Sequence, residues 1–139
     1  MDHTLSLFIA EDDRHTQAAF QHYTDTLDDV KLIGISSTVG DAVRKIGDFL
    51  PHAVILDLEL ENGSGGLEVL RRVKDASLSK PPFFLITTLC LDTSVQEQAR
   101  SLGAGFILYK KQGSYSEQYA VDFLRYMSET IIKFYNKSC

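Results

Sequence analysis

Residues 53–57 read Ala-Val-Ile-Leu-Asp, an unbroken apolar run that ends at a carboxylate. Such a run is typical of a strand that is covered on both faces, as in a parallel sheet. Four other short apolar runs have the same character, and segments with helical spacing separate them. The other runs are Leu5–Ala10, Leu32–Ile35, Phe83–Ile86 and Phe106–Tyr109.

Apolar residues recur at helical spacing in the five segments that follow these strands. The first helix is predicted over residues 14–27, and the second is ended by Pro51. A loop at residues 61–66, read as a flexible turn, precedes the third. The fourth spans residues 92–102, with Asp92 as its N-cap. The last is predicted as one extended helix over residues 114–137, which would be ~36 Å long.

Alternating strands and helices predict an α/β protein with a parallel sheet and helices on both faces. Five such units, (βα)₅, suit a doubly wound, flavodoxin-like domain with strand order 2-1-3-4-5. The 139 residues contain no repeat or linker, so one domain is expected over residues 1–139, with a core of about 5–130. In this class of fold, ligands bind at the carboxyl ends of the strands.

The charge, the cysteine content and the apolar runs of the sequence exclude several classes of protein. The net charge of −5, from 14 basic and 19 acidic residues, argues against direct binding of nucleic acid. Two cysteines are too few for a disulfide framework. The sequence has neither an apolar run of membrane-spanning length nor a basic, signal-like N-terminus. We therefore expect a reduced, cytoplasmic protein that does not enter a membrane.

Polar residues stand where the predicted strands end. Glu11 and Asp12 follow the first strand, and Asp57 follows the third. Thr87 and Lys110 end the fourth and fifth strands. Two carboxylates 4 Å apart repel by ~4 kcal/mol at an effective dielectric constant of 20, and a divalent cation relieves that cost. Mg²⁺ fits best, because it takes a few carboxylate oxygens and leaves room for phosphate.

These residues suit phosphoryl transfer. Asp57 is the best nucleophile, since an aspartyl carboxylate can form an acyl phosphate. Asp12 would bind the metal directly and Glu11 through a water molecule. The Thr87 hydroxyl would donate to a phosphoryl oxygen, and the Lys110 ammonium would pair with Asp57 and then with the phosphoryl group. A one-residue shift in phase would give the role of Thr87 to its neighbour.

Over residues ~5–130 the chain resembles the receiver domain of bacterial two-component response regulators. The resemblance rests on the segments FIAEDD, VILDLELENGSGG, FLITT and GAGFILYK. It implies a sensor histidine kinase or phosphotransfer protein that phosphorylates Asp57, and dependence on Mg²⁺. It also implies a metal ligand in the backbone carbonyl of Glu59. The surface formed by helix 4, strand 5 and helix 5 would switch and could form a homodimer, and a C-terminal output domain could be missing.

Three positions depart from the pattern of that family. Glu11 replaces the more usual Asp. Lys111 stands where the family has a proline, so we expect a trans bond and a different loop there. Ile107 occupies the position of the aromatic switch residue, while Phe106 should face the opposite side of its strand.

Two other functions remain open from the sequence. The missing proline and aromatic residue would suit a phosphorylation-independent interaction or dimerisation module. A Mg²⁺-dependent phosphatase would use Asp57 as nucleophile and Glu59 as general acid, but the chain is short for a substrate pocket. The favoured interpretation is a phosphoacceptor signalling module whose only catalysis is its own phosphorylation and slow dephosphorylation.

Overall fold

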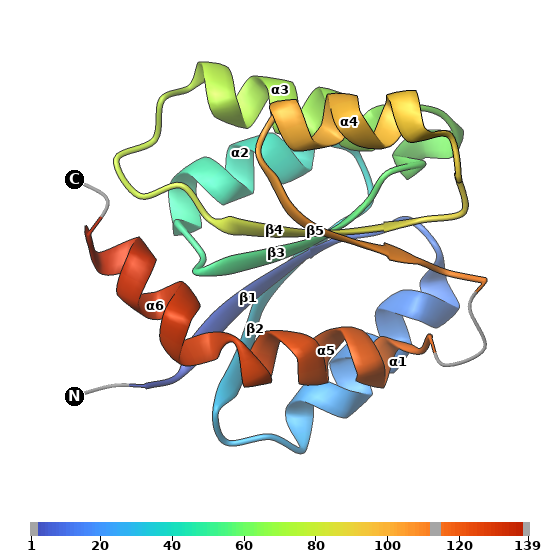
Figure 1. Cartoon of the computed structure of the whole chain (residues 1–139). Coiled ribbons are helices and arrows are strands. Elements are labelled where there is room, and N and C mark those ends of the chain that lie inside the picture. Colours follow the sequence, from blue (N-terminus) through green and yellow to red (C-terminus); the bar gives the residue numbers. More distant parts are fainter. Residues whose placement is uncertain (1–2, 112–114, 138–139) are drawn as a thin grey trace.

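The computed structural model in Figure 1 describes residues 3–111 and 115–137 and confirms the predicted α/β architecture. Its five-stranded sheet has the order β2-β1-β3-β4-β5, and every neighbouring pair is parallel. The strands are β1 (Leu5–Ala10), β2 (Val30–Ser36), β3 (Ala53–Asp57), β4 (Phe83–Thr88) and β5 (Ala104–Tyr109).

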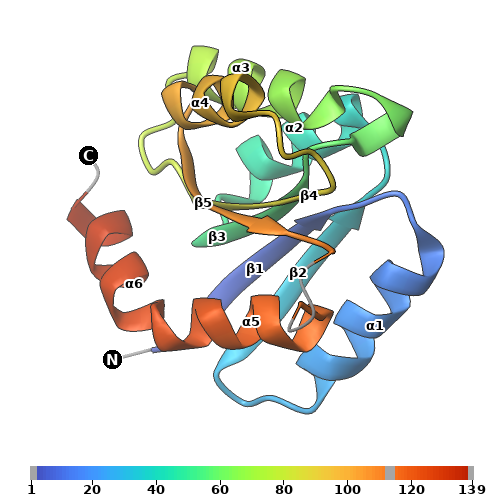
Figure 2. The ribbon, with the colours of Figure 1, turned by 45° about the vertical axis from the view of Figure 1, so that its right-hand side comes forward.

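Helices cover both faces of the sheet (Figures 1 and 2). On one face lie α2 (Val39–Phe49), α3 (Gly65–Asp75) and α4 (Thr93–Ser101). On the other lie α1 (Arg14–Asp25) and α5 (Glu117–Tyr126). Each face has its own buried apolar cluster, because successive strand residues point to opposite sides. Among the described residues, no helix is long and apolar enough to cross a membrane.

Local signals place the helix ends close to the predicted positions. The side chain of Asp92 accepts a hydrogen bond from the Ser94 N–H and so caps α4, as predicted. Asp13 caps α1 in the same way, through the Thr16 N–H. Gly103, with φ +111°, follows the C-cap of α4, a conformation that favours glycine.

The prediction of a flexible loop over residues 61–66 is only partly right. A short 3₁₀ helix, η1, spans Leu60–Asn62, and Glu61 within it has a left-handed φ of 59°. Helix α3 already begins at Gly65. The backbone of the helix start packs directly on the end of β3, since the Gly66 N–H donates to the Leu58 carbonyl at 3.1 Å. Glycine is needed there for the close approach of two backbone segments, because a Cβ on Gly66 would lie 2.6 Å from the Asp57 carbonyl oxygen.

The prediction of one extended C-terminal helix is wrong. Helix α5 ends at Tyr126, and α6 (Ser128–Lys137) continues in a different direction (Figure 2). At Met127 the backbone has φ −90° and ψ 0°, which ends the regular helix. Tertiary packing stabilises the bend, because it lets α6 fold back so that Ile131 is buried against the domain. The helical pattern of the sequence is the same on both sides of the break and does not reveal it.

Tyr135 anchors α6 to the amino edge of the sheet. Its hydroxyl donates to the carbonyl of Leu50, the left-handed C-cap of α2. Its ring lies edge-on to His52, with 4.6 Å between centroids, and 5.2 Å from the Lys80 ammonium. The length of the C-terminal segment therefore serves packing within the domain.

Replacing Tyr135 with Phe should lower the free energy of unfolding by about 1 kcal/mol, because the Leu50 carbonyl loses its donor while the ring contacts remain. Urea denaturation measures the change. Tyr126→Phe is the matched control, since Tyr126 is 88% exposed and should tolerate the change. Equal stability of both variants would show that the Tyr135 hydroxyl contributes nothing.

Candidate functional site

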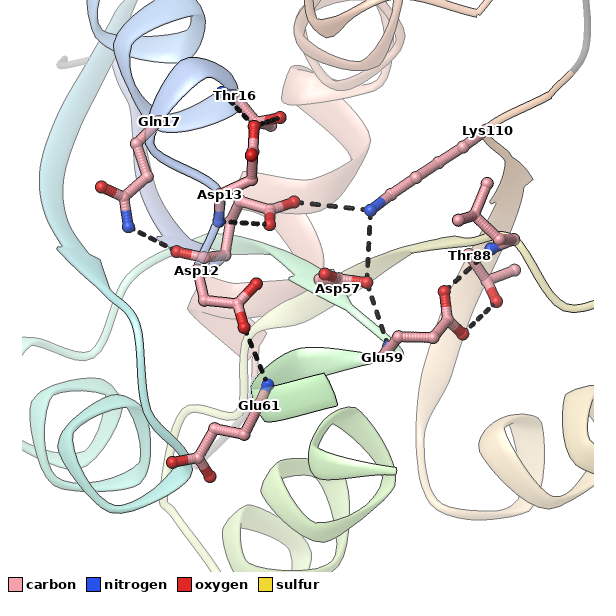
Figure 3. A network of polar contacts seen from close by, with 11 residues as sticks. Asp12, Asp13, Thr16, Gln17, Asp57, Glu59, Glu61, Thr88 and Lys110 are labelled. Atoms are coloured by element: carbon pink, nitrogen blue, oxygen red, sulfur yellow. Dashed lines mark hydrogen bonds and ion pairs between the residues drawn. The ribbon is translucent and has the colours of Figure 1, made fainter. Parts of the chain in front are cut away.

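The carboxyl ends of β1, β3, β4 and β5 meet at one edge of the sheet (Figure 3). Asp57 and Thr87 are register partners at the ends of β3 and β4, and both are buried. The Lys110 N–H donates to the Thr88 carbonyl at 2.8 Å, which continues the pairing of β5 with β4. The parallel register thus brings residues from four strands to this carboxyl edge.

Three carboxylates gather there. Oxygen atoms of Glu11, Asp12 and Asp57 lie within 4.8 Å of one another. Glu11 and Asp57 are only 4% and 5% exposed, while Asp12 is half-buried. Oxygen ligands at this spacing suit a hard divalent cation. The residues present therefore fit the metal site that the sequence predicts.

A single ammonium group balances part of this charge. Lys110 Nζ lies 3.2 Å from Asp57 Oδ1 and 3.5 Å from Glu11 Oε1. Burial alone would lower the pKa of Lys110, but the charges of Asp57 and Glu11 outweigh it and raise the pKa. Lys110 is therefore held as a cation between the two buried acids, Glu11 and Asp57.

The carboxyl of Glu11 has a strongly raised pKa. All causes together raise the pKa of its carboxyl from 4.5 to about 7, and burial is the largest of them. A hydrogen bond from the Asp13 N–H, at 2.9 Å, opposes the shift, as does the charge of Lys110, while the charge of Asp57 contributes to it. Without a metal, Glu11 is consequently half protonated near neutral pH.

This shift predicts a dependence of stability on pH. Between pH 4.5 and 7 the folded chain binds more protons at Glu11 than the unfolded chain, so the free energy of unfolding falls as the pH rises. The full shift, from 4.5 to about 7, corresponds to about 3 kcal/mol. Urea denaturation in EDTA at pH 5 and 7.5 should show this loss in the wild type and a smaller one in Glu11→Gln. If the free energy of unfolding fell by the same amount between pH 5 and 7.5 in both proteins, the raised pKa of the buried Glu11 would be contradicted.

Backbone groups orient the other two acids. Asp12 Oδ2 accepts the Glu61 N–H at 3.1 Å, so the left-handed turn at Glu61 aims its amide at the cluster. Asp57 Oδ1 accepts the Glu59 N–H at 3.0 Å. The segment after β3 therefore supplies two donors to the carboxylates that end β1 and β3.

The two threonines that end β4 point to opposite faces of the sheet. Thr87 shares the face of Asp57, because they are register partners in parallel strands. Thr88 points the other way, and its hydroxyl donates to Glu59 Oε2 at 2.6 Å. The alternation thus puts Thr87, and not its neighbour, on the side of the predicted acceptor.

The hydrogen bonds of the Glu59 side chain were not foreseen from the sequence, which indicated only a metal-binding backbone carbonyl or a general acid at this position. Its second oxygen, Oε1, accepts the Leu89 N–H at 2.8 Å. The adjacency of β3 and β4 was the available signal, since residues just past neighbouring parallel strands meet at one edge. Because both oxygens of the Glu59 carboxylate accept hydrogen bonds, from Thr88 and Leu89, the side chain is not free to act as a general acid. This weighs against the phosphatase hypothesis.

The positions that depart from the family pattern lie as follows. Ile107 packs against the apolar cluster under α2, α3 and α4. Phe106 faces the other side, as predicted, and its ring lies 4.6 Å from that of Phe123 on α5. The Lys110–Lys111 bond is trans, as expected. The predicted change of loop falls on residues 112–114, outside the described residues.

Tyr115 is a neighbour of the site that sequence reasoning missed. Burial raises the pKa of its hydroxyl, and the charges of Glu117, Glu11 and Asp57 raise it further. Its ring packs against the apolar cluster under α1 and α5. The hydroxyl of Tyr115 is therefore held in its protonated form, in part by the negative charges of Glu11 and Asp57.

Comparisons with known proteins agree with this geometry. No family profile matches the sequence. The chain is 30% identical over 116 residues to the transcriptional regulatory protein DesR of Bacillus subtilis, covering 84% of this chain and 55% of DesR. It is 33% identical over 89 residues to the regulatory protein LuxO of Vibrio cholerae, covering 63% of this chain and 19% of LuxO. The chain thus spans about half of DesR and a fifth of LuxO.

Solved structures share the whole fold. The signal receiver domain of the putative response regulator NarL from Mycobacterium tuberculosis superposes with a TM-score of 0.76 at 17% identity, covering 91% of this chain and 97% of that one. A DNA-binding response regulator of the LuxR family from Staphylococcus aureus gives 0.73 at 26% identity, covering 89% and 98%. The cluster of Glu11, Asp12 and Asp57 is consistent with the phosphorylation site of a receiver domain. The chain therefore belongs to the receiver domains of bacterial two-component response regulators, which are signalling modules and not enzymes of the ordinary kind.

Proposed function

We propose that this chain accepts a phosphoryl group on Asp57 from a sensor histidine kinase or a phosphotransfer protein. The observation that carries the proposal is the environment of Asp57. It is a buried carboxylate with two further carboxylates within 4.8 Å and the Lys110 ammonium at 3.2 Å. A nucleophile, a metal-binding set and a cation for the incoming phosphate are thus assembled around one side chain.

The chemistry needs few groups. An Asp57 oxygen attacks the phosphorus of the donor, and the bond from phosphorus to the donor breaks with its electron pair on the leaving group. Lys110 pairs with the transferred oxygens and offsets the charge that accumulates on them. The Thr87 hydroxyl, on the same face as Asp57, donates to one of these oxygens.

Mg²⁺ is the proposed cofactor: Asp12, Asp57 and the Glu59 carbonyl would hold it directly, and Glu11 would hold it through water. A bound Mg²⁺ would supply positive charge against the acidic cluster and the phosphoryl oxygens. The Glu61 amide, now bonded to Asp12 Oδ2, orients that carboxylate for the ion.

The output follows from the charge change at Asp57. We infer that Thr87 and Lys110 respond to it and that Ile107 repacks beneath α4, altering the surface of α4, β5 and α5. This surface carries partly exposed aromatic rings, Phe106 and Tyr119, which would suit a second copy of the chain. An output domain is the other candidate partner, since the curated relatives are longer than this chain.

Intact-mass spectrometry with acetyl phosphate or phosphoramidate tests the proposal. With Mg²⁺ the chain should gain about 80 Da, and with EDTA it should not. Peptide mapping should place the addition on the segment that contains Asp57. If no adduct forms with either donor, the phosphorylation-independent interaction module becomes the better account.

A further inference from the structure

The side chain of Glu59 joins the segment after β3 to the loop after β4 (Figure 3). Each carboxylate oxygen has its own donor: the Thr88 hydroxyl at 2.6 Å and the Leu89 N–H at 2.8 Å. The Thr88 hydroxyl in turn accepts the Cys90 N–H at 2.9 Å. One carboxylate thereby organises three consecutive residues at the start of the β4–α4 loop.

Apolar burial contributes little to holding this loop, which comprises residues 89–92. Leu89 and Leu91 are 50% and 63% exposed. The Gln96 side chain donates to the Cys90 carbonyl at 3.2 Å, a neutral and longer bond. Hydrogen bonds to a charged acceptor are about twice as strong as neutral ones. Glu59 is therefore the strongest described restraint on the first half of the loop.

Glu59 is also coupled to the acceptor. Its N–H donates to Asp57 Oδ1 at 3.0 Å, and the same oxygen lies 3.2 Å from Lys110 Nζ. An acyl phosphate on Asp57 would change a charge of −1 to about −2 at pH 7. The added charge would arise next to the segment that carries the Glu59 carboxylate, and like charges at a partly buried site repel.

We propose that Glu59 is a latch: its carboxylate holds residues 88–90 while Asp57 is unmodified and releases them when Asp57 is phosphorylated. The holding step is independent of the proposed function, whereas the release step rests on it. The latch gives this chain a route from Asp57 to the β4–α4 loop that needs no aromatic residue at position 107.

Glu59→Gln tests the holding step in the unmodified protein. A glutamine has one acceptor oxygen and an NH₂ donor, so it cannot accept from both Thr88 and Leu89. Hydrogen exchange measured by NMR should be at least tenfold faster for the Leu89 amide, since its charged acceptor is replaced by a neutral one and the amide then opens locally more often. Unchanged protection of Leu89 would overturn the latch.

Glu61→Gln is the matched control. It makes the same change of charge two residues away, but the Glu61 side chain accepts the Val39 N–H on α2 and does not reach the β4–α4 loop. Exchange at Leu89 should stay at the wild-type rate. An equal acceleration in both variants would assign the effect to net charge and refute the latch.

The release step is tested on protein whose phosphoryl adduct has been verified by mass, with acetyl phosphate as donor and acetate as leaving group. Phosphorylation should accelerate exchange at Leu89 about tenfold in the wild type and add little in Glu59→Gln, a dependence that a merely structural role would not produce. Full modification without faster exchange would refute release. Failure to form any adduct would refute both the proposed function and the release step. The comparison of Glu59→Gln with the unmodified wild type would still test the holding step.

Discussion

Replacing Asp57 with Asn is expected to abolish the mass increase of about 80 Da that acetyl phosphate and Mg²⁺ produce in the wild type. The amide carries no negative charge and is a poor nucleophile, so no acyl phosphate forms. Asparagine has the same size and keeps a carbonyl oxygen for the Glu59 N–H, so the fold should be retained. An adduct that persists in the variant would identify another acceptor.

The same variant should be at least as stable as the wild type when metal is removed with EDTA. It deletes one of three carboxylates that share the Lys110 ammonium, and the repulsion is visible in the way Asp57 raises the pKa of Glu11. Lys110 loses one ion pair but keeps Glu11 at 3.5 Å. Thermal melts in EDTA measure the change, and a loss of more than about 1 kcal/mol would contradict the repulsive cluster.

Adding Mg²⁺ to the same two proteins completes the comparison. A ligand that binds only the folded state raises its stability according to its affinity. The wild type should therefore gain more than Asp57→Asn, which lacks one carboxylate. An equal gain in both would indicate that the ion binds elsewhere.

Replacing Gly66 with Ala is expected to destabilise the domain by about 3 kcal/mol. A Cβ at this position would lie 2.6 Å from the Asp57 carbonyl oxygen and 2.6 Å from the Leu58 Cα. Both neighbours are backbone atoms, so relief requires moving the end of β3 or the start of α3, as in an overpacked core. Because Asp57 itself would shift, phosphoryl acceptance should also slow. Urea denaturation and the mass assay measure the two effects.

Gly47→Ala provides the control for this substitution. Gly47 lies on the exposed side of α2, with no atom within 4 Å of an added Cβ. Alanine favours a helix by up to about 1 kcal/mol over glycine, so this variant should gain stability. If Gly66→Ala proved as benign as Gly47→Ala, the close packing of α3 on β3 would be wrong.

Prediction from the sequence succeeded where the chemistry of a segment is nearly independent of its neighbours. The run at residues 53–57 is apolar on both faces, which only a covered strand accommodates, and the structure confirms it as fully buried. The N-cap Asp92 could be predicted for the same reason, since its side chain bonds only within the first turn of its own helix. Right-handed crossovers then left few possible strand orders.

Prediction failed where the local structure depends on contacts between segments that are far apart in the sequence. Nothing in the helical pattern around Met127 marks a break, because α6 bends in order to bury Ile131 and to place Tyr135 on the Leu50 carbonyl, 85 residues away in sequence. Gly65 and Gly66 looked like a flexible turn, since the backbone atoms that exclude a side chain belong to the preceding segment.

The sequence by itself determined the parallel sheet and the set of residues at its carboxyl edge, because the residue at which each apolar run ends and the two-residue alternation of side chains are local properties. Only the tertiary structure decided the directions of the polar contacts at that edge: Thr88 toward Glu59, and the Glu61 amide toward Asp12. Hydrogen bonds of this kind depend on distances and angles between separate loops, which no spacing along the chain specifies.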